Sequence, residues 1–295
     1  MDIVDINNIK LNNTAVALGK FQGLHKGHML LVDEIIKLAK SYKLQSVLVS
    51  INMNDDKVIY TDEERMSLLE QKGIDTVAMC EFSEAIMHLS PEDFVKKYLV
   101  DALGVKYVVV GMDYRFGYQR TGDIKCLIDL GNKYGFNVIT FDKLLIKNVI
   151  VSTTYIRELI LTSDFTNANA FLGRNYSIKG KVLRGKQLGR TIGFPTINIV
   201  PSDNKLLPEL GAYETLVNVD GKLYKGITNV GNNPTVSDGK DVIIETHIFD
   251  FNEDIYDKYV TVEFIRFIRK QKKFESVDEL KKQLELDKSS VILHQ

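Results

Sequence analysis

Apolar and polar residues alternate along the first half of the chain in the rhythm of strands separated by helices. Residues 15–18 form an unbroken apolar run, and residues 29–39 then repeat apolar side chains at helical spacing. The same criteria predict further strands at 46–51, 75–79, 107–111 and 137–141, and helices at 62–72, 90–103 and 123–134. Repeated β-α-β units predict an open parallel sheet with helices on both faces, in which ligands bind beyond the carboxyl ends of the strands.

The pattern changes after Arg174 to short apolar segments divided by Gly, Pro, Asn and Asp. These segments predict strands at 176–182, 196–200, 213–219, 223–230, 242–249 and 259–267. Asp220-Gly221 is a hairpin signal, and Ser276 begins a final helix that we expect to reach about residue 286. Short antiparallel strands predict a small barrel. We therefore expect one domain over residues 1–173 and a second over residues 174–295.

Composition and charge narrow the classes of partner. The 295 residues are 44% hydrophobic and 26% charged, with a net charge of -1. Such a balance gives no bulk electrostatic case for nucleic acid or an anionic membrane. The N-terminus does not resemble a signal peptide, and Cys80 and Cys126 form no metal-type pair, so we expect free thiols in a cytoplasmic protein with small-molecule substrates. The oligomeric state is not indicated.

The turn over residues 19–28 is the first candidate site. It contains three glycines, and His25 and His28 lie three residues apart where the predicted helix begins. A helix N-terminus offers unpaired N–H groups and a partial positive charge, and imidazole N–H donors add to them, so the turn suits a phosphate. A loop with two surface histidines is the plainer alternative, and the strand-turn-helix context favours the nucleotide site.

Two further segments are candidates for the same site. Residues 111–117 follow a predicted buried strand, and residues 151–157 open a helix. The hydroxyls of Thr153 and Thr154, with Arg157 one turn later, suit a polyphosphate. Taken alone, they would be an ordinary helix cap and a surface ion pair.

The glycine-rich segment over residues 180–198 is the second candidate site. Its glycines allow backbone N–H groups to approach phosphates closely, and its spacing is not that of a Walker loop. Thr196 and Asn198 are two residues apart, so on a strand they share a face and together suit Mg²⁺ beside a phosphate. A β-turn followed by a polar strand face is the alternative.

These motifs resemble one family over nearly the whole chain. The histidine turn, Gly111-Met112-Asp113-Tyr114-Arg115-Phe116-Gly117 and Ser152-Thr153-Thr154-Tyr155-Ile156-Arg157 occur in the order found in the FMN adenylyltransferase half of bacterial bifunctional riboflavin kinase/FAD synthetases. Residues 189–198 resemble the Gly-Arg-x-x-Gly-Phe-Pro-Thr-x-Asn motif of riboflavin kinases, and residues 245–251 complete that pattern.

The resemblance implies a fold and two reactions. It implies a Rossmann-like nucleotidylyltransferase domain and a six-stranded antiparallel β-barrel riboflavin kinase domain with a C-terminal helix. It also implies phosphorylation of riboflavin to FMN by ATP, followed by adenylylation of FMN to FAD with release of pyrophosphate. ATP is then a substrate, and Mg²⁺ the expected cofactor.

The resemblance also implies residue roles. Glu245 would accept the proton of the ribityl 5′-hydroxyl, and His25 and His28 would hold ATP phosphates during adenylyl transfer. Thr196 and Asn198 would bind the metal. The nucleotide- and phosphate-binding set would comprise Gly19, Phe21, Gly23, Asp113, Thr153, Thr154, Arg157, Gly185, Gly189 and Arg190.

Two departures from the family pattern keep alternatives open. Gln22 stands where the family has an aspartate, and residues 52–56 read Asn-Met-Asn-Asp-Asp where a Phe-Asp-Pro-His-Pro stretch is expected. One alternative is a riboflavin kinase whose first domain is impaired in adenylyl transfer. Another is a flavin-binding regulator without turnover.

Overall fold

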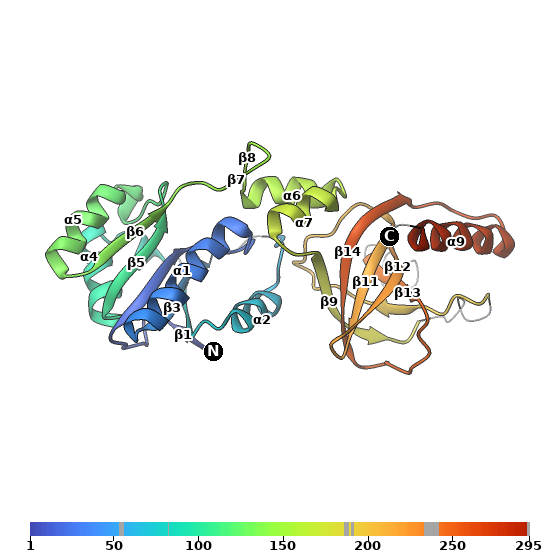
Figure 1. Ribbon diagram of the computed structural model, residues 1–295, viewed down its shortest axis with the longest axis horizontal. Coiled ribbons are helices and arrows are strands. Elements are labelled where there is room, and N and C mark those ends of the chain that lie inside the picture. Colours follow the sequence, from blue (N-terminus) through green and yellow to red (C-terminus); the bar gives the residue numbers. More distant parts are fainter. Residues whose placement is uncertain (53–55, 82, 186–188, 190–191, 233–241, 294–295) are drawn as a thin grey trace. The chain divides into compact units, whose positions relative to one another are not determined.

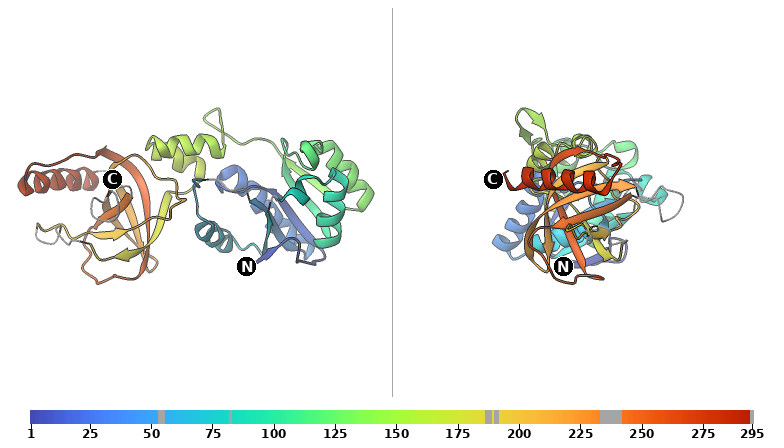
Figure 2. Two further views of the ribbon diagram at one scale, coloured as in Figure 1. Left: turned by 180° about the vertical axis from the view of Figure 1, so that it is seen from behind. Right: turned by 90° about the vertical axis from the view of Figure 1, so that its right-hand side faces the viewer.

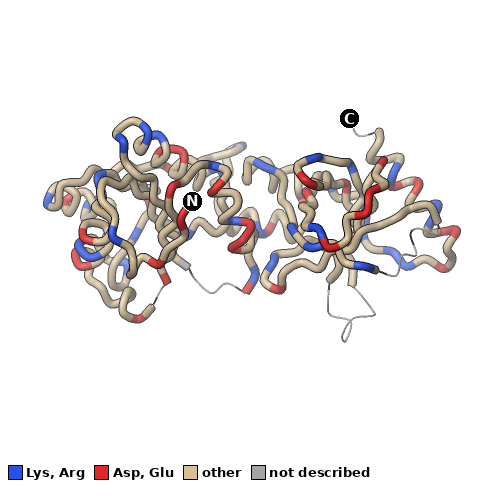
Figure 3. Tube along the Cα trace, turned by 90° about the horizontal axis from the view of Figure 1, so that it is seen from below, with Lys and Arg blue, Asp and Glu red and all other residues tan. Residues whose placement is uncertain are grey.

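The computed structural model describes residues 1–52, 56–81, 83–185, 189, 192–232 and 242–293 (Figure 1). The chain forms two compact units. The first contains Met1–Asp56 and Asp62–Thr153, and the second contains Lys57–Thr61 and Thr154–Gln295. Basic and acidic residues are interspersed along both units (Figure 3).

A six-stranded parallel sheet forms the centre of the first unit, with strand order β1-β4-β3-β2-β5-β6. The strands are β1 Asp2–Asp5, β2 Thr14–Gly19, β3 Gln45–Asn52, β4 Thr76–Glu81, β5 Val105–Gly111 and β6 Asn137–Phe141. The chain leaves β2 toward β3 on one side and later returns to pair β5 on the other. The carboxyl ends of β2 and β5 therefore flank the topological switch point, where ligands bind in such sheets.

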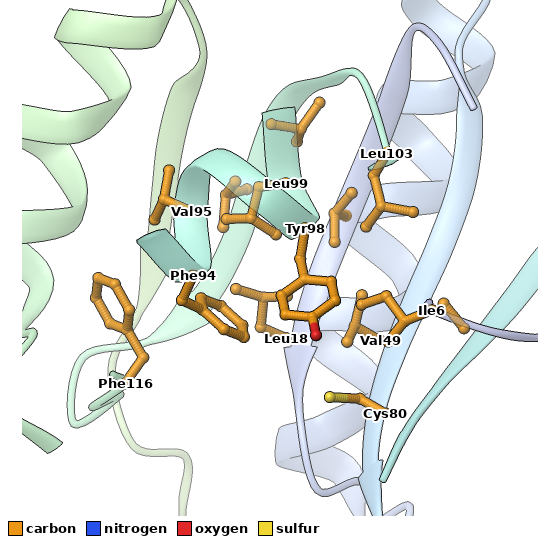
Figure 4. Close-up of a cluster of buried hydrophobic side chains, with 14 of the residues drawn as sticks. Ile6, Leu18, Val49, Cys80, Phe94, Val95, Tyr98, Leu99, Leu103 and Phe116 are labelled. Carbon is orange, nitrogen blue, oxygen red and sulfur yellow. The ribbon is translucent and has the colours of Figure 1, made fainter. Parts of the chain in front are cut away.

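Helices pack against this sheet. They are α1 Lys26–Tyr42, α2 Asp62–Lys72, α3 Glu84–Met87, α4 Pro91–Phe94, η1 Val95–Ala102, η2 Tyr118–Arg120 and α5 Ile124–Tyr134. Figure 4 shows Phe94 and Tyr98 packed with Leu18 and Val49 of the sheet in one buried cluster. The helix predicted over 90–103 begins at the Ser90 cap as expected, but η1 continues it with π rather than α spacing. A small hairpin of β7 Leu145–Ile146 and β8 Val149–Ile150 follows β6.

A closed antiparallel barrel forms the core of the second unit, with strand order β10-β13-β12-β11-β14-β9. Its strands are β9 Tyr176–Leu183, β10 Ile197–Ile199, β11 Gly211–Val219, β12 Lys222–Asn232, β13 Val242–Ile248 and β14 Tyr259–Lys270. The hairpin predicted at Asp220-Gly221 is confirmed, because both residues have the positive φ that such a tight turn requires. The parallel sheet and the six-stranded barrel were therefore both predicted correctly.

The described residues of the barrel unit also form the helices α6 Thr153–Leu161, α7 Phe165–Leu172 and α9 Val277–Ile292. Ser276 caps α9 as predicted, and the helix runs further than expected because Val291 is buried against Ile227 and Phe249. Figure 2 shows α9 on the outside of the barrel. The sequence analysis missed α7, which buries Phe165 among Tyr176, Tyr213 and Phe264.

Residues 57–61 belong to the second unit although both flanking segments belong to the first. The backbone of Val58 exchanges hydrogen bonds of 2.7 and 2.8 Å with Asn204 and Leu206. The buried ammonium of Lys205 donates to the carbonyl of Ile59 at 2.7 Å and lies over the Tyr60 ring. A few residues between β3 and α2 are thus built into the barrel unit.

Candidate active sites

The turn between β2 and α1 builds the first candidate site. His25 is the N-cap of α1, and its Nδ1 accepts the backbone N–H of His28 at 3.2 Å. Because Nδ1 is the acceptor, a neutral His25 ring carries its proton on Nε2, the form that donates to a phosphate oxygen. The two imidazole rings stack with their centroids 3.6 Å apart, so one helix start presents both.

The backbone of this turn is strained. Phe21 and Leu24 are buried and have φ values of 48° and 37°, in the left-handed region that residues other than glycine rarely adopt. Such strain costs about 1–3 kcal/mol for each residue and is concentrated at functional sites. A Cβ on Gly23 would lie 3.0 Å from Thr153 Oγ1, so the glycine lets the turn approach that hydroxyl closely.

A cavity of about 300 Å³ opens beside the turn. The turn contributes Gly19, Phe21, His25 and His28, the end of β5 contributes Asp113, and the start of α6 contributes Thr153. Asp113 is largely exposed and pairs with Lys143 at 3.1 Å. The structure therefore brings together most residues proposed for this site at the switch point of the sheet.

Thr154 and Arg157 belong to the second unit and are described with it. Thr154 is exposed on α6. The guanidinium of Arg157 donates to the carbonyl oxygen of Lys57. In this structure Arg157 therefore contributes to holding residues 57–61.

Strands β10 and β13 build the second candidate site. Thr196 Oγ1 donates to Glu245 Oε1 at 2.7 Å, and Asn198 lies directly opposite Glu245 in the strand register. Because opposed residues of an antiparallel pair project from the same face, the hydroxyl, amide and carboxylate converge. The hydroxyl of Thr196 and the amide oxygen of Asn198 are oxygen ligands of the kind that Mg²⁺ prefers, so this pair fits the ion beside a bound phosphate and leaves Glu245 next to it.

Glycines adjoin these side chains. A Cβ on Gly185 would lie 2.3 Å from Asn198 Nδ2, and one on Gly189 would lie 2.1 Å from the carbonyl oxygen of Phe194. No larger residue fits at either place without a shift. Arg190, the other residue proposed here, lies outside the described residues.

Two cavities meet at Thr196. One of about 410 Å³ is lined by Pro195, Thr196 and the mostly polar loop over residues 251–256. The other, of about 210 Å³, is lined by Thr196, Glu245, apolar side chains of the barrel and, from α9, Leu280 and Leu284. A group bound in either cavity therefore borders Thr196, as transfer between two bound substrates requires.

The wall formed by α9 is held by a buried ion pair. Asp287 is 2% exposed and accepts from Arg269 Nε at 3.1 Å and from Nη2 at 2.8 Å. Gln283 donates a further bond of 2.9 Å to the same carboxylate. A fully bonded buried carboxylate fixes the helix, because breaking such a pair leaves an uncompensated charge.

His247 also lines the smaller cavity, although the sequence analysis gave it no role. Its Nδ1 lies 2.8 Å from the carbonyl oxygen of Pro195. Burial lowers the pKa of the imidazole below its ordinary value, so the ring is neutral near pH 7. Its place two residues after Glu245 on a strand was the available signal, since such residues share a face.

Cys80 and Cys126 are free thiols, and Cys80 is buried. Among the described residues, no group of three or more His, Cys, Asp and Glu side chains gathers as a metal site would. No helix in the described part of the chain has the length and apolar character needed to cross a membrane.

Comparison with known proteins places the chain in one family. A model described as FAD synthetase matches residues 7–155, and one described as riboflavin kinase matches residues 172–292. A bifunctional riboflavin kinase/FMN adenylyltransferase of Buchnera aphidicola (subspecies Acyrthosiphon pisum) is 35% identical, covering 96% of this chain and 94% of the relative. The Bacillus subtilis protein of that name is 31% identical and covers 95% and 92%. A crystal structure from Streptococcus pneumoniae, named a macrolide-efflux protein, matches with a TM-score of 0.87 and 31% identity, covering 99% of this chain and 98% of its own. The chain belongs to the family of bifunctional riboflavin kinases/FMN adenylyltransferases.

Proposed function

We propose that the chain phosphorylates riboflavin to FMN at the barrel and adenylylates FMN to FAD at the parallel sheet. The family match supports both reactions and the use of ATP as substrate. The observation that carries the kinase assignment is the Thr196–Glu245 hydrogen bond where two cavities meet. The two matched ranges support our division into residues 1–173 and 174–295, although residues 154–173, with α7, belong to the barrel unit of the structure.

At the barrel, the larger and more polar cavity takes the nucleotide and the smaller, apolar one takes the flavin. Glu245 accepts the proton of the ribityl 5′-hydroxyl while that oxygen forms its bond to the γ-phosphorus of ATP. The bond from the γ-phosphorus to the β,γ-bridging oxygen breaks, and ADP leaves. Thr196 and Asn198 would hold Mg²⁺, which when bound would neutralise charge on the phosphates. The protein otherwise acts by positioning the two substrates.

At the parallel sheet, a phosphate oxygen of FMN forms a bond to the α-phosphorus of ATP, and pyrophosphate leaves. His25 and His28 donate to phosphate oxygens as charge shifts toward the leaving group. Asp113 borders the shared nucleotide and flavin site, while Thr153, Thr154 and Arg157 serve the β- and γ-phosphates. Gly19, Phe21 and Gly23 shape the turn, and Gly185, Gly189 and Arg190 serve nucleotide binding at the barrel.

Gln22 favours a second candidate, a kinase with impaired adenylyl transfer. A glutamine supplies hydrogen bonds, but it lacks the charge and the hard-cation affinity of the family's aspartate. The remaining phosphate-binding residues are present, so we expect slowed rather than abolished FAD synthesis.

Chromatography of the products from riboflavin, ATP and Mg²⁺ separates the candidates. FMN followed by FAD supports the full proposal, FMN alone supports the kinase-only alternative, and neither product supports a flavin-binding regulator. Glu245→Gln should lower FMN formation by about 10²–10⁴-fold, the usual contribution of a general base. FAD formation from supplied FMN should be unchanged in that variant and serves as its internal control. A loss of less than about tenfold would remove Glu245 as the base.

A further inference from the structure

We propose that His247 is a positioning residue for phosphoryl transfer, which holds the Pro195–Thr196 peptide so that the Thr196 hydroxyl meets Glu245. The proposal rests on the kinase function proposed above. It assigns His247 no contact with the reacting atoms. Its role is to fix a backbone segment that the sheet leaves without strand pairing.

The alternation of β13 places His247 beside the proposed base. Glu245 and His247 share one face of the strand, whereas Thr246 turns to the other and bonds Thr228 at 2.8 Å inside the barrel. His247 is 8% exposed, and its Nδ1 lies 2.8 Å from the carbonyl oxygen of Pro195. Because a carbonyl oxygen only accepts, Nδ1 carries the proton and donates.

The carbonyl bonded by His247 belongs to the peptide that joins Pro195 to Thr196. Its direction therefore sets the orientation of Thr196. The ladder between β10 and β13 begins only at Ile197, opposite Thr246. On the other side, Phe194 is held through its N–H, which donates to the Gly189 carbonyl at 2.8 Å. The hydrogen bond from His247 therefore holds the Pro195 carbonyl, which lies between the bonded N–H of Phe194 and the first paired residue of β10.

A proline at position 195 increases this dependence. Proline has no N–H, so its carbonyl is the one backbone group through which hydrogen bonding can fix this residue. The His247 ring meets Phe194 edge-on at 5.1 Å between centroids and Phe249 at 5.6 Å. These contacts pack the ring beside the strand, and the Nδ1 donor itself fixes the carbonyl.

A packing role and a positioning role predict opposite rankings of two variants. His247→Phe keeps the ring, its volume and its contacts with Phe194 and Phe249, but it removes the donor. His247→Asn loses most of the ring, but it places an amide N–H close to the position of Nδ1. If His247 acts by packing, His247→Phe should retain the higher kcat. If it acts by positioning, His247→Asn should retain the higher kcat.

The test measures kcat and the KM values for ATP and riboflavin in FMN formation by the full chain, together with calorimetric binding of Mg²⁺-ADP. His247→Phe should lower kcat by roughly 10–100-fold, the scale of a misplaced catalytic group, and should weaken Mg²⁺-ADP binding. The KM for riboflavin should change less than kcat, because phenylalanine keeps the ring that lines the flavin cavity. His247→Asn should recover most of both losses despite a lower thermal midpoint. Phe249→Leu alters packing on the same ring without touching the donor and should keep the wild-type kcat.

Three results would overturn the assignment. They are wild-type kinetics in His247→Phe, a larger loss of kcat in His247→Asn than in His247→Phe, and a loss in Phe249→Leu equal to that in His247→Phe. If the wild type forms no FMN, the proposed function fails separately. The Mg²⁺-ADP affinities of the two His247 variants then decide the role of His247 without turnover.

Discussion

Phe165 on α7 should carry a large share of the stability of the barrel unit. Its side chain is 1% exposed and stacks against Tyr176 and Phe264, with centroid distances of 5.8 and 5.1 Å, and lies edge-on to Tyr213 at 5.7 Å. Truncating a core phenylalanine to alanine typically costs about 3–5 kcal/mol. The aromatic pairs add about 0.5–1.5 kcal/mol beyond the buried area, so we expect Phe165→Ala near the upper end of that range.

The assay is urea unfolding of the full chain, read in two ways. The chain has no tryptophan, so far-UV circular dichroism follows structure, and residual FMN formation follows the barrel unit. With a urea slope near 2 kcal/mol/M, a loss of about 4 kcal/mol moves the midpoint of FMN formation down by about 2 M. Leu161→Ala, at a side chain 49% exposed on α6, is the matched control and should change stability by less than about 0.5 kcal/mol.

A fragment comparison extends the same reasoning. Residues 154–295 retain α7, whereas residues 174–295 lack it and leave the faces of Tyr176, Tyr213 and Phe264 uncovered. Both fragments lack residues 57–61, so Lys205 loses its hydrogen bond to Ile59 in each. The stability lost with that bond is therefore the same in both fragments and does not affect the comparison. The longer fragment should unfold at the higher urea concentration. Equal midpoints, or a Phe165→Ala loss below about 1 kcal/mol, would refute the view that α7 is part of the barrel core.

Three further predictions concern the first unit. His28→Ala should reduce FAD formation from FMN while leaving riboflavin phosphorylation unchanged, as measured by chromatography with each flavin supplied separately; parallel loss of both activities in a folded variant would contradict separate sites. Gln22→Asp should raise FAD formation and leave FMN formation unchanged, and an unchanged FAD rate would direct attention to residues 52–56. Burial raises the pKa of the Cys80 thiol to about 11, so the folded state retains this proton more strongly than the unfolded state. The contribution of Cys80 to stability is then complete below about pH 9 and is lost as the pH rises through about 11. Alkaline denaturation of wild type and Cys80→Ala should therefore show a difference in unfolding free energy that shrinks as the pH rises.

Sequence patterns predicted an element correctly where the residues of that element alone determine its structure. The strand over 137–141 and the helix over 62–72 have the predicted bounds, because apolar runs and glycine or capping signals lie within the segment. In contrast, α7 reads Phe-Thr-Asn-Ala-Asn-Ala-Phe-Leu, whose asparagines and threonine are weak helix formers. Tertiary burial of its phenylalanines outweighs that propensity, and the Asp164 cap and the Gly173 stop were the local signals that the sequence analysis passed over.

The same distinction explains which site residues could be found. The histidine turn and the threonine-asparagine pair are each contiguous, so their spacing indicated phosphate and metal chemistry directly. The partners of these residues are remote. Pro195 and His247 are 52 positions apart, and Thr196 and Glu245 are 49 apart. Only the register of β10 with β13 brings them together, and that register depends on the closed barrel.

The two sites therefore differ in how they should tolerate substitution. At the parallel sheet, the proposed phosphate-binding groups come from loops at strand ends, and the capping bond between His25 and His28 is made within three residues. A change such as Gln22 can alter charge there while the local geometry survives. At the barrel, the proposed base, its threonine partner and the histidine that orients the threonine depend on one strand register. A one-residue slip would turn Glu245 to the opposite face of β13, so at this site stability of the barrel and catalysis are properties of the same contacts.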